Sequence, residues 1–169
     1  EAYKKLDSFN PKIGYPKKWR DYSALSIVPG DLMANEIALR KYYAADQNNR
    51  VGTKTDRDEW FMTPQTINAY YNAQFNEIVF PAAILQAPFF DVNADPAVNY
   101  GGIGAVIGHE MGHVFDDQGS KSDWAGIQRN WWTDADRANF QKKVDALGAQ
   151  FDSYCPIEKT CVNGKLTMG

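Results

Sequence analysis

The spacing of apolar residues predicts two helices in this 169-residue chain. In residues 32–47 an apolar face follows Asp31, whose carboxylate can cap the first turn, and we expect this helix to end before residues 48–52. In residues 133–151 apolar side chains recur at intervals of four, three and four residues. That interval is typical of a buried helical stripe.

Shorter apolar runs predict strands. Residues 66–71 and 77–80 are rich in aromatic and β-branched side chains and flank a polar turn, which predicts a hairpin with an edge strand. Asn163 and Gly164 predict a second hairpin near the C-terminus. Residues 1–30 combine six basic residues with prolines and glycines, so we expect an irregular segment on a larger body, with a basic recognition patch as the alternative.

The central helix is expected in residues 100–115, although this segment contains five glycines. Gly104, Gly108 and Gly112 recur at every fourth position and form a bare stripe that another element could approach closely. Each internal glycine costs about 1 kcal/mol relative to alanine. A solvated helix would gain nothing in return, so burial of this helix is expected.

Composition excludes several classes of protein. Hydrophobic residues make up 44% of the chain and charged residues 23%, which is enough apolar surface for one folded domain. The net charge of −3 gives no electrostatic reason to expect a nucleic-acid partner. No run of 18 apolar residues is present, so we predict no transmembrane segment in this chain.

The chemical signal is an HExxH pattern formed by His109, Glu110 and His113 within the central helix. Residues four apart share a helix face, so the two imidazoles can converge on one metal ion, for which zinc is the natural candidate. Glu110 is turned away from the two ligands and can accept a proton from a water molecule. The pattern therefore indicates metal-assisted amide hydrolysis, although it also arises by chance in helices with structural histidines.

No third metal ligand is evident from the sequence. Asp116 and Gly119 occupy the positions where a metzincin would have glycine and histidine, which excludes that class. Asp116 and Asp117 are better candidates for acceptors of imidazole N–H groups or for helix-end charges. Glu158 lies between two cysteines and is a poor ligand candidate.

The chain resembles the neprilysin and endothelin-converting-enzyme family of zinc metallopeptidases, which includes bacterial oligopeptidases. The resemblance rests on an ordered series of motifs and weakens outside it. The series is NAYY at residues 68–71, IVFPA at 78–82, LQAPFF at 85–90, NYGGIG at 99–104 and HEMGHVFDD at 109–117, with weaker similarity in YPKKWRDY at 15–22.

The resemblance implies an α+β fold: an incomplete thermolysin-like (zincin) catalytic lobe with an edge β-hairpin and a central HExxH helix. It assigns His109 and His113 to one zinc ion, Glu110 to the role of general base, and Asn68 and Ala69 to the backbone of a peptide substrate. The expected function is that of a zinc metalloendopeptidase acting on oligopeptides. A non-catalytic zinc-binding or protein-binding module that uses the HExxH helix as scaffold is the alternative.

The resemblance also implies that residues 1–169 form only part of a catalytic domain. The family's third ligand is a glutamate downstream of the region that matches residues 166–169, so we expect it from a missing C-terminal part or from another chain. The large helical lobe of the family is also absent. Alone, this chain is expected to bind zinc weakly and to turn over poorly or not at all.

The two cysteines are informative about the redox state of the compartment in which the protein resides. The spacing of Cys155 and Cys161 fits a local disulfide, although two free thiols in a reducing compartment fit the same spacing. Members of the family are typically periplasmic, secreted or membrane-anchored ectodomains. The resemblance therefore implies an extracytoplasmic location and favours the disulfide.

Overall fold

The computed structural model describes residues 1–158 and 160–167. The chain divides into two compact units: a larger unit of Glu1–Tyr15 with Met62–Gly169, and a smaller unit of Pro16–Phe61. Within the described part of the chain, no helix is both long enough and apolar enough to cross a membrane.

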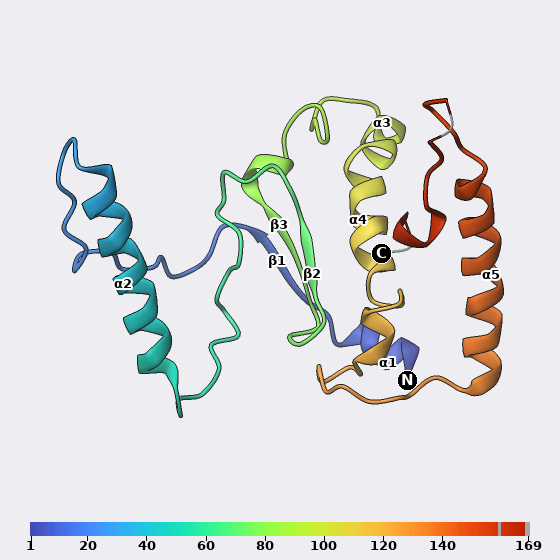
Figure 1. Ribbon diagram of the computed structural model, residues 1–169, viewed down its shortest axis with the longest axis horizontal. Coiled ribbons are helices and arrows are strands. Elements are labelled where there is room, and N and C mark those ends of the chain that lie inside the picture. The colour runs from blue at the N-terminus through green and yellow to red at the C-terminus, as the bar shows by residue number, and fades with distance from the viewer. Residues whose placement is uncertain (159, 168–169) are drawn as a thin grey trace. The chain divides into compact units, whose positions relative to one another are not determined.

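The larger unit contains a three-stranded sheet (Figure 1). The strands are β1 (Asn10–Gly14), β2 (Tyr70–Asn72) and β3 (Glu77–Pro81), in the order β1-β3-β2. β3 pairs in parallel with β1 and antiparallel with β2, and all five of its residues are buried. The predicted hairpin of β2 and β3 is confirmed, although β2 begins only at Tyr70.

The prediction of an irregular segment in residues 1–30 is wrong for its first half, which forms helix α1 (Ala2–Asp7) and strand β1. The side chains of β1 reverse the usual polarity, because Lys12 is 8% exposed and Ile13 is 67% exposed. Lys12 Nζ lies 2.6 Å from an oxygen of the buried Glu77. This ion pair across two strands allows the lysine to face inward, a pattern that hydrophobic periodicity misses.

The predicted central helix is two helices, α3 (Pro96–Gly101) and α4 (Ile103–Gly112), separated by Gly102. The backbone of Gly102 passes so close to Phe89 that a Cβ there would lie 2.5 Å from the carbonyl oxygen of Phe89. That carbonyl accepts a hydrogen bond of 2.7 Å from Ile103 N–H. The contact with Phe89 therefore fixes the break between the helices and requires glycine.

The expected close approach along the glycine stripe of α4 is not observed. A Cβ added at Gly108 or Gly112 would meet nothing within 4 Å in the described structure. α4 buries only Ile103 and Glu110. The first turn of α4 joins the core, which consists of Ala69, Ile78, Phe80, Ile84 and Ile103 with Leu85, Phe89 and Val106 packed around them.

The last part of the larger unit contains α5 (Asp134–Asp152) and two short 3₁₀ helices, η2 (Gly119–Lys121) and η3 (Gly164–Thr167). A third, η1 (Ala82–Ile84), follows β3. The side chain of Thr133 accepts the backbone N–H of Asp136 at 3.1 Å and so caps α5. The predicted buried stripe is wrong, because Gly148 is the one residue of α5 that is buried in this structure. η3 takes the place of the predicted second hairpin.

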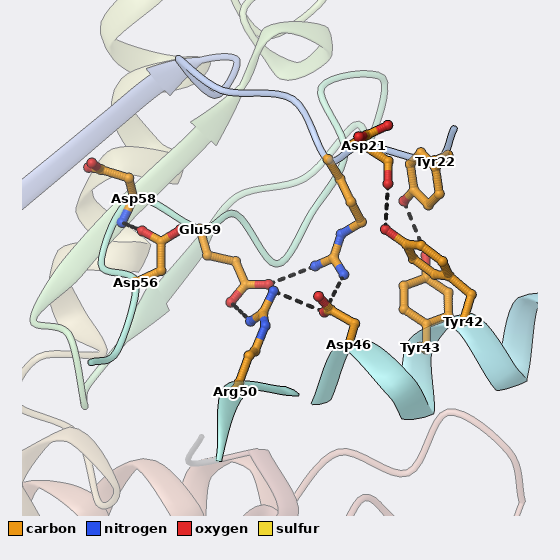
Figure 2. A network of polar contacts seen from close by, with 10 residues as sticks. Asp21, Tyr22, Tyr42, Tyr43, Asp46, Arg50, Asp56, Asp58 and Glu59 are labelled. Carbon is orange, nitrogen blue, oxygen red and sulfur yellow. Dashed lines mark hydrogen bonds and ion pairs between the residues drawn. The ribbon is translucent and has the colours of Figure 1, made fainter. Parts of the chain in front are cut away.

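The smaller unit contains one helix, α2 (Leu32–Arg50), which the side chain of Asp31 caps as predicted. It ends at Arg50, three residues beyond the predicted range. Figure 2 shows the polar network that ties α2 to the segments on either side of it, in which Arg50 of the helix pairs with both Asp46 and Glu59. Arg20 completes an alternating set of charges, at 3.0 Å from Asp46 and 2.7 Å from Glu59. Such networks stabilise a helix that buries no residue within its own unit.

A close backbone contact in the larger unit gives a testable prediction. Gly126 has a φ of +81°, and a Cβ there would lie 1.9 Å from the carbonyl oxygen of Gln74. Gly14 has a φ of +88° but no atom within 4 Å of the same position. Gly126→Ala should therefore lower the free energy of unfolding by about 1–3 kcal/mol more than Gly14→Ala, measured by urea denaturation. Equal losses would show that the contact with Gln74 contributes nothing beyond the φ angle.

Candidate active site

Helix α4 brings the two histidines of the chain together at its C-terminal end. His109 lies in the last turn of α4, and His113 is the C-cap residue. The two Nε2 atoms are 3.0 Å apart, and the rings are nearly perpendicular with centroids 4.5 Å apart. Two nitrogens bound to one tetrahedral zinc ion lie about 3.3 Å apart. The imidazoles therefore converge as a pair of metal donors would.

A hydrogen bond to the carboxylate of Asp116 orients the second imidazole. His113 Nδ1 lies 2.7 Å from one carboxylate oxygen of Asp116. The other oxygen accepts the backbone N–H groups of Gln118 and Gly119 at 2.9 and 2.7 Å. A proton held on Nδ1 leaves Nε2 of His113 free to donate its lone pair to a metal. Asp116 thus has the position of the imidazole partner that the sequence analysis anticipated.

Asp117 does not share this role in the structure. Its side chain is exposed and accepts a hydrogen bond from the side-chain amide of Gln118. The sequence alone could not separate the two aspartates, because residues three and four positions beyond His113 are both within reach of a helix end. The turn after α4 decides between them.

Glu110 is adjacent to the first histidine and buried, with 5% of its surface exposed. Burial raises the pKa of its carboxyl group above the usual value. The charges of His113 and His109 and a hydrogen bond from the backbone N–H of Tyr71 offset part of this effect. A buried carboxylate with a raised pKa next to two imidazoles is suited to accept a proton.

Asn68 and Ala69 lie directly before β2 rather than within it. The side chain of Asn68 is exposed and accepts the backbone N–H of Ala69 at 2.9 Å, whereas Ala69 is buried. β2 is an edge strand of the described sheet and contacts α4. These two residues therefore stand at the start of an edge that adjoins the helix of the site.

Two further residues of this region, Tyr71 and Lys5, have shifted pKa values that were not expected from the sequence. Burial and the charge of Asp116 raise the pKa of the Tyr71 hydroxyl. Burial lowers the pKa of Lys5 to about 8, against the charges of Asp123 and Asp116. Lys5 therefore remains mostly protonated at neutral pH. Tyr71 belongs to a predicted strand, but no sequence signal marks Lys5.

The donor set within the described residues is incomplete. His109 and His113 offer two nitrogens, and no group of three or more His, Cys, Asp or Glu in residues 1–158 and 160–167 is arranged to hold a metal ion. The chemistry of the two imidazoles fits zinc, which favours nitrogen ligands. Away from this site, a disulfide joins Cys155 and Cys161 between α5 and η3.

A model of peptidase family M13 matches residues 68–169 of the chain. Among curated proteins, the neutral endopeptidase of Lactobacillus helveticus is 41% identical over 173 residues, which cover 100% of this chain and 26% of the relative. Endothelin-converting enzyme 1 of Homo sapiens is 37% identical over 178 residues, which cover 99% of this chain and 23% of the relative.

Solved structures agree with the sequence matches. The Mycobacterium tuberculosis zinc metalloprotease ZMP1 in complex with an inhibitor superposes with a TM-score of 0.89 at 52% identity, over 99% of this chain and 26% of that chain. PepO from Lactobacillus rhamnosis superposes with a TM-score of 0.85 at 39% identity, over 99% of this chain and 27% of that chain.

The chain belongs to peptidase family M13, the family of neprilysin, endothelin-converting enzyme and PepO. It is a mixed α+β segment that matches part of the catalytic domain of this family. It spans about a quarter of the length of the relatives described above. The resemblance inferred from the ordered motifs is therefore confirmed.

The pKa of Glu110 predicts a pH-dependent effect on stability. In metal-free protein, Glu110→Gln should raise the melting temperature at pH 7. Burial raises the pKa of this carboxyl group in the folded state, so its ionisation opposes folding at pH values above the ordinary pKa. Both the folded and unfolded states are protonated below the ordinary pKa of 4.5, so the difference between variant and wild type should shrink as the pH falls toward that value.

Asp117→Asn is the control, since its carboxylate is exposed. It should show no such pH-dependent gain. A stability difference for Glu110→Gln that is constant from pH 7 to about pH 4 would contradict the raised pKa.

Proposed function

We propose that this chain is part of the catalytic lobe of a zinc metalloendopeptidase that hydrolyses peptide bonds of oligopeptides. The observation that carries the proposal is the convergence of His109 and His113, with Nε2 atoms 3.0 Å apart, beside the buried Glu110. Membership of family M13 supports it. Residues 1–169 are then a partial catalytic domain of the thermolysin-like type, and the large helical lobe lies outside them.

His109 and His113 would hold one zinc ion, and Asp116 would keep Nε2 of His113 available for it. Bound zinc would act as a Lewis acid toward water and toward the peptide carbonyl group. Because the described residues provide two donors, we expect the third ligand from a further part of the protein or from another chain. A site with two protein donors should bind zinc weakly by itself.

Glu110 would be the general base. It accepts a proton from the water molecule whose oxygen adds to the carbonyl carbon of the substrate, and it then delivers a proton to the nitrogen that leaves as the C–N bond breaks. Its raised pKa makes the carboxylate a stronger proton acceptor than an exposed glutamate. Burial of the carboxyl group is the main cause of that shift.

Asn68 and Ala69, at the start of the β2 edge, would bind the backbone of the peptide substrate. An extended peptide can add to the edge of a sheet through main-chain hydrogen bonds, which do not depend on its side chains. The disulfide between Cys155 and Cys161 supports an extracytoplasmic location for the protein, because such bonds persist in oxidising compartments.

Glu110→Gln in the intact protein tests the proposal against a non-catalytic zinc-binding or protein-binding module. The amide cannot accept the proton, so hydrolysis of a quenched peptide should fall by at least 100-fold while the zinc content stays unchanged. The peptidase assay and elemental analysis measure the two quantities on one sample. Retention of wild-type turnover in Glu110→Gln would rule out Glu110 as the base. The absence of turnover in zinc-loaded wild-type protein would rule out the proposed peptidase activity.

The two aspartates after α4 provide a matched pair for the metal site. Asp116→Asn should weaken zinc binding by about 10–100-fold, because the amide no longer favours a proton on Nδ1 of His113. Asp117→Asn removes the same charge at the next position, where the side chain is exposed. It should change the zinc affinity less than threefold. Competition with a chelator measures both. Equal effects would indicate that only the local charge matters.

A further inference from the structure

Lys5 of α1 reaches into the backbone of a segment more than a hundred residues away. Its side chain is 0% exposed. Nζ donates hydrogen bonds to the carbonyl oxygens of Val114 at 2.9 Å, Gly119 at 2.6 Å and Ser122 at 2.6 Å. A lysine ammonium has three hydrogens, so every one of them is used by this segment.

The three carbonyl groups belong to the segment that carries Asp116. Val114 directly follows His113, and Gly119 and Ser122 close the turn on the other side. Gly119 is bonded at both of its backbone groups, since its N–H donates to Asp116 and its C=O accepts from Lys5. The ammonium therefore holds both ends of the turn that places the Asp116 carboxylate against His113.

This turn depends on a cation at its centre. A Cβ on Gly119 would lie 1.8 Å from the carbonyl oxygen of His113, so the chain folds back very closely on itself. Three inward-facing carbonyl dipoles repel one another and are costly to bury without donors. The carbonyl of Gly119 also accepts the N–H of Ser122 at 3.1 Å, and that of Ser122 accepts the indole N–H of Trp131 at 2.9 Å. Loss of the ammonium would therefore remove the bond to Val114, next to His113, and the charge that offsets all three dipoles, and we expect the turn that holds Asp116 to loosen at this end.

Lys5 is itself fixed from the side of the sheet. Its backbone carbonyl accepts a hydrogen bond of 2.9 Å from the side-chain amide of Asn76, which is 1% exposed in the turn between β2 and β3. The hydroxyl of Tyr71 on β2 donates to the other side-chain atom of Asn76 at 3.1 Å. The lysine thus joins the β2–β3 hairpin to the turn after α4.

We infer that Lys5 is a positioning residue of the metal centre, which holds Asp116 on His113 by binding the carbonyl oxygens of Val114, Gly119 and Ser122. The inference rests on the proposed function in so far as it takes His113 to be a zinc ligand. Lys5 touches neither the metal nor the substrate, so its effect on the site passes through Asp116.

Lys5→Met in the intact protein tests the inference, since methionine keeps the apolar stem and removes the ammonium. Lys121→Met is the matched control, because Lys121 lies in the same segment but is exposed and contacts the side chain of Gln118. Zinc affinity is measured by dialysis against chelator-buffered zinc. We expect Lys5→Met to bind zinc at least tenfold more weakly than wild type, and Lys121→Met to stay within twofold.

A double-mutant cycle with Asp116→Asn separates positioning from general stability. If Lys5 acts through Asp116, Lys5→Met should weaken zinc binding by less than threefold once Asp116 is replaced. A purely structural lysine would give the same factor in both backgrounds. Equal factors, or zinc affinity within twofold of wild type in folded Lys5→Met, would overturn the inference.

If Lys5→Met does not fold, Lys5→Gln replaces it in the test. Glutamine keeps two donor hydrogens without the charge, so we expect an intermediate loss of zinc affinity. Failure of both variants to fold where Lys121→Met folds would assign Lys5 a structural role alone and overturn the inference. Wild-type protein that binds zinc but cleaves no peptide would overturn the proposed function and leave the zinc result for Lys5 standing.

Discussion

The hydrogen bond between Nδ1 of His113 and Asp116 is the constraint on which the candidate site depends. α4 alone brings two imidazoles to one face, but a helix does not determine which ring nitrogen carries the proton. The turn after the helix settles that by presenting a carboxylate whose other oxygen is already held by two backbone N–H groups. The chemistry of a residue on a regular helix is therefore set by irregular backbone beyond its end.

Much of the fold and site follows from sequence because those parts obey local rules. The cap at Asp31, the β2–β3 hairpin and the position of the HExxH residues depend on spacing within a few residues. β1 escapes prediction because its inward-facing lysine pairs with Glu77, which lies in the neighbouring strand but is distant in the sequence. The break at Gly102 escapes for the same reason, since its cause is the carbonyl of Phe89.

The glycines show most clearly which contacts cannot be predicted from local sequence. Periodicity pointed to Gly108 and Gly112 as sites of close approach, yet both face open space in the described structure. The glycines that are sterically required are isolated in sequence, at Gly102, Gly119 and Gly126, where another backbone passes. In the same way, the sequence predicts His109 and His113 as the metal donors, but only the structure separates Asp116 from Asp117 and reveals Lys5.

The bond between Lys5 and Ser122 spans 117 residues and has a consequence for biosynthesis. Contacts of such long separation form late, because the intervening chain must first be ordered. During synthesis α1 leaves the ribosome before the turn after α4, and the ammonium of Lys5 is bound only by water until that turn has emerged. The contact that we infer to position Asp116 against His113 is therefore made only after the turn at residues 114–122 has been synthesised.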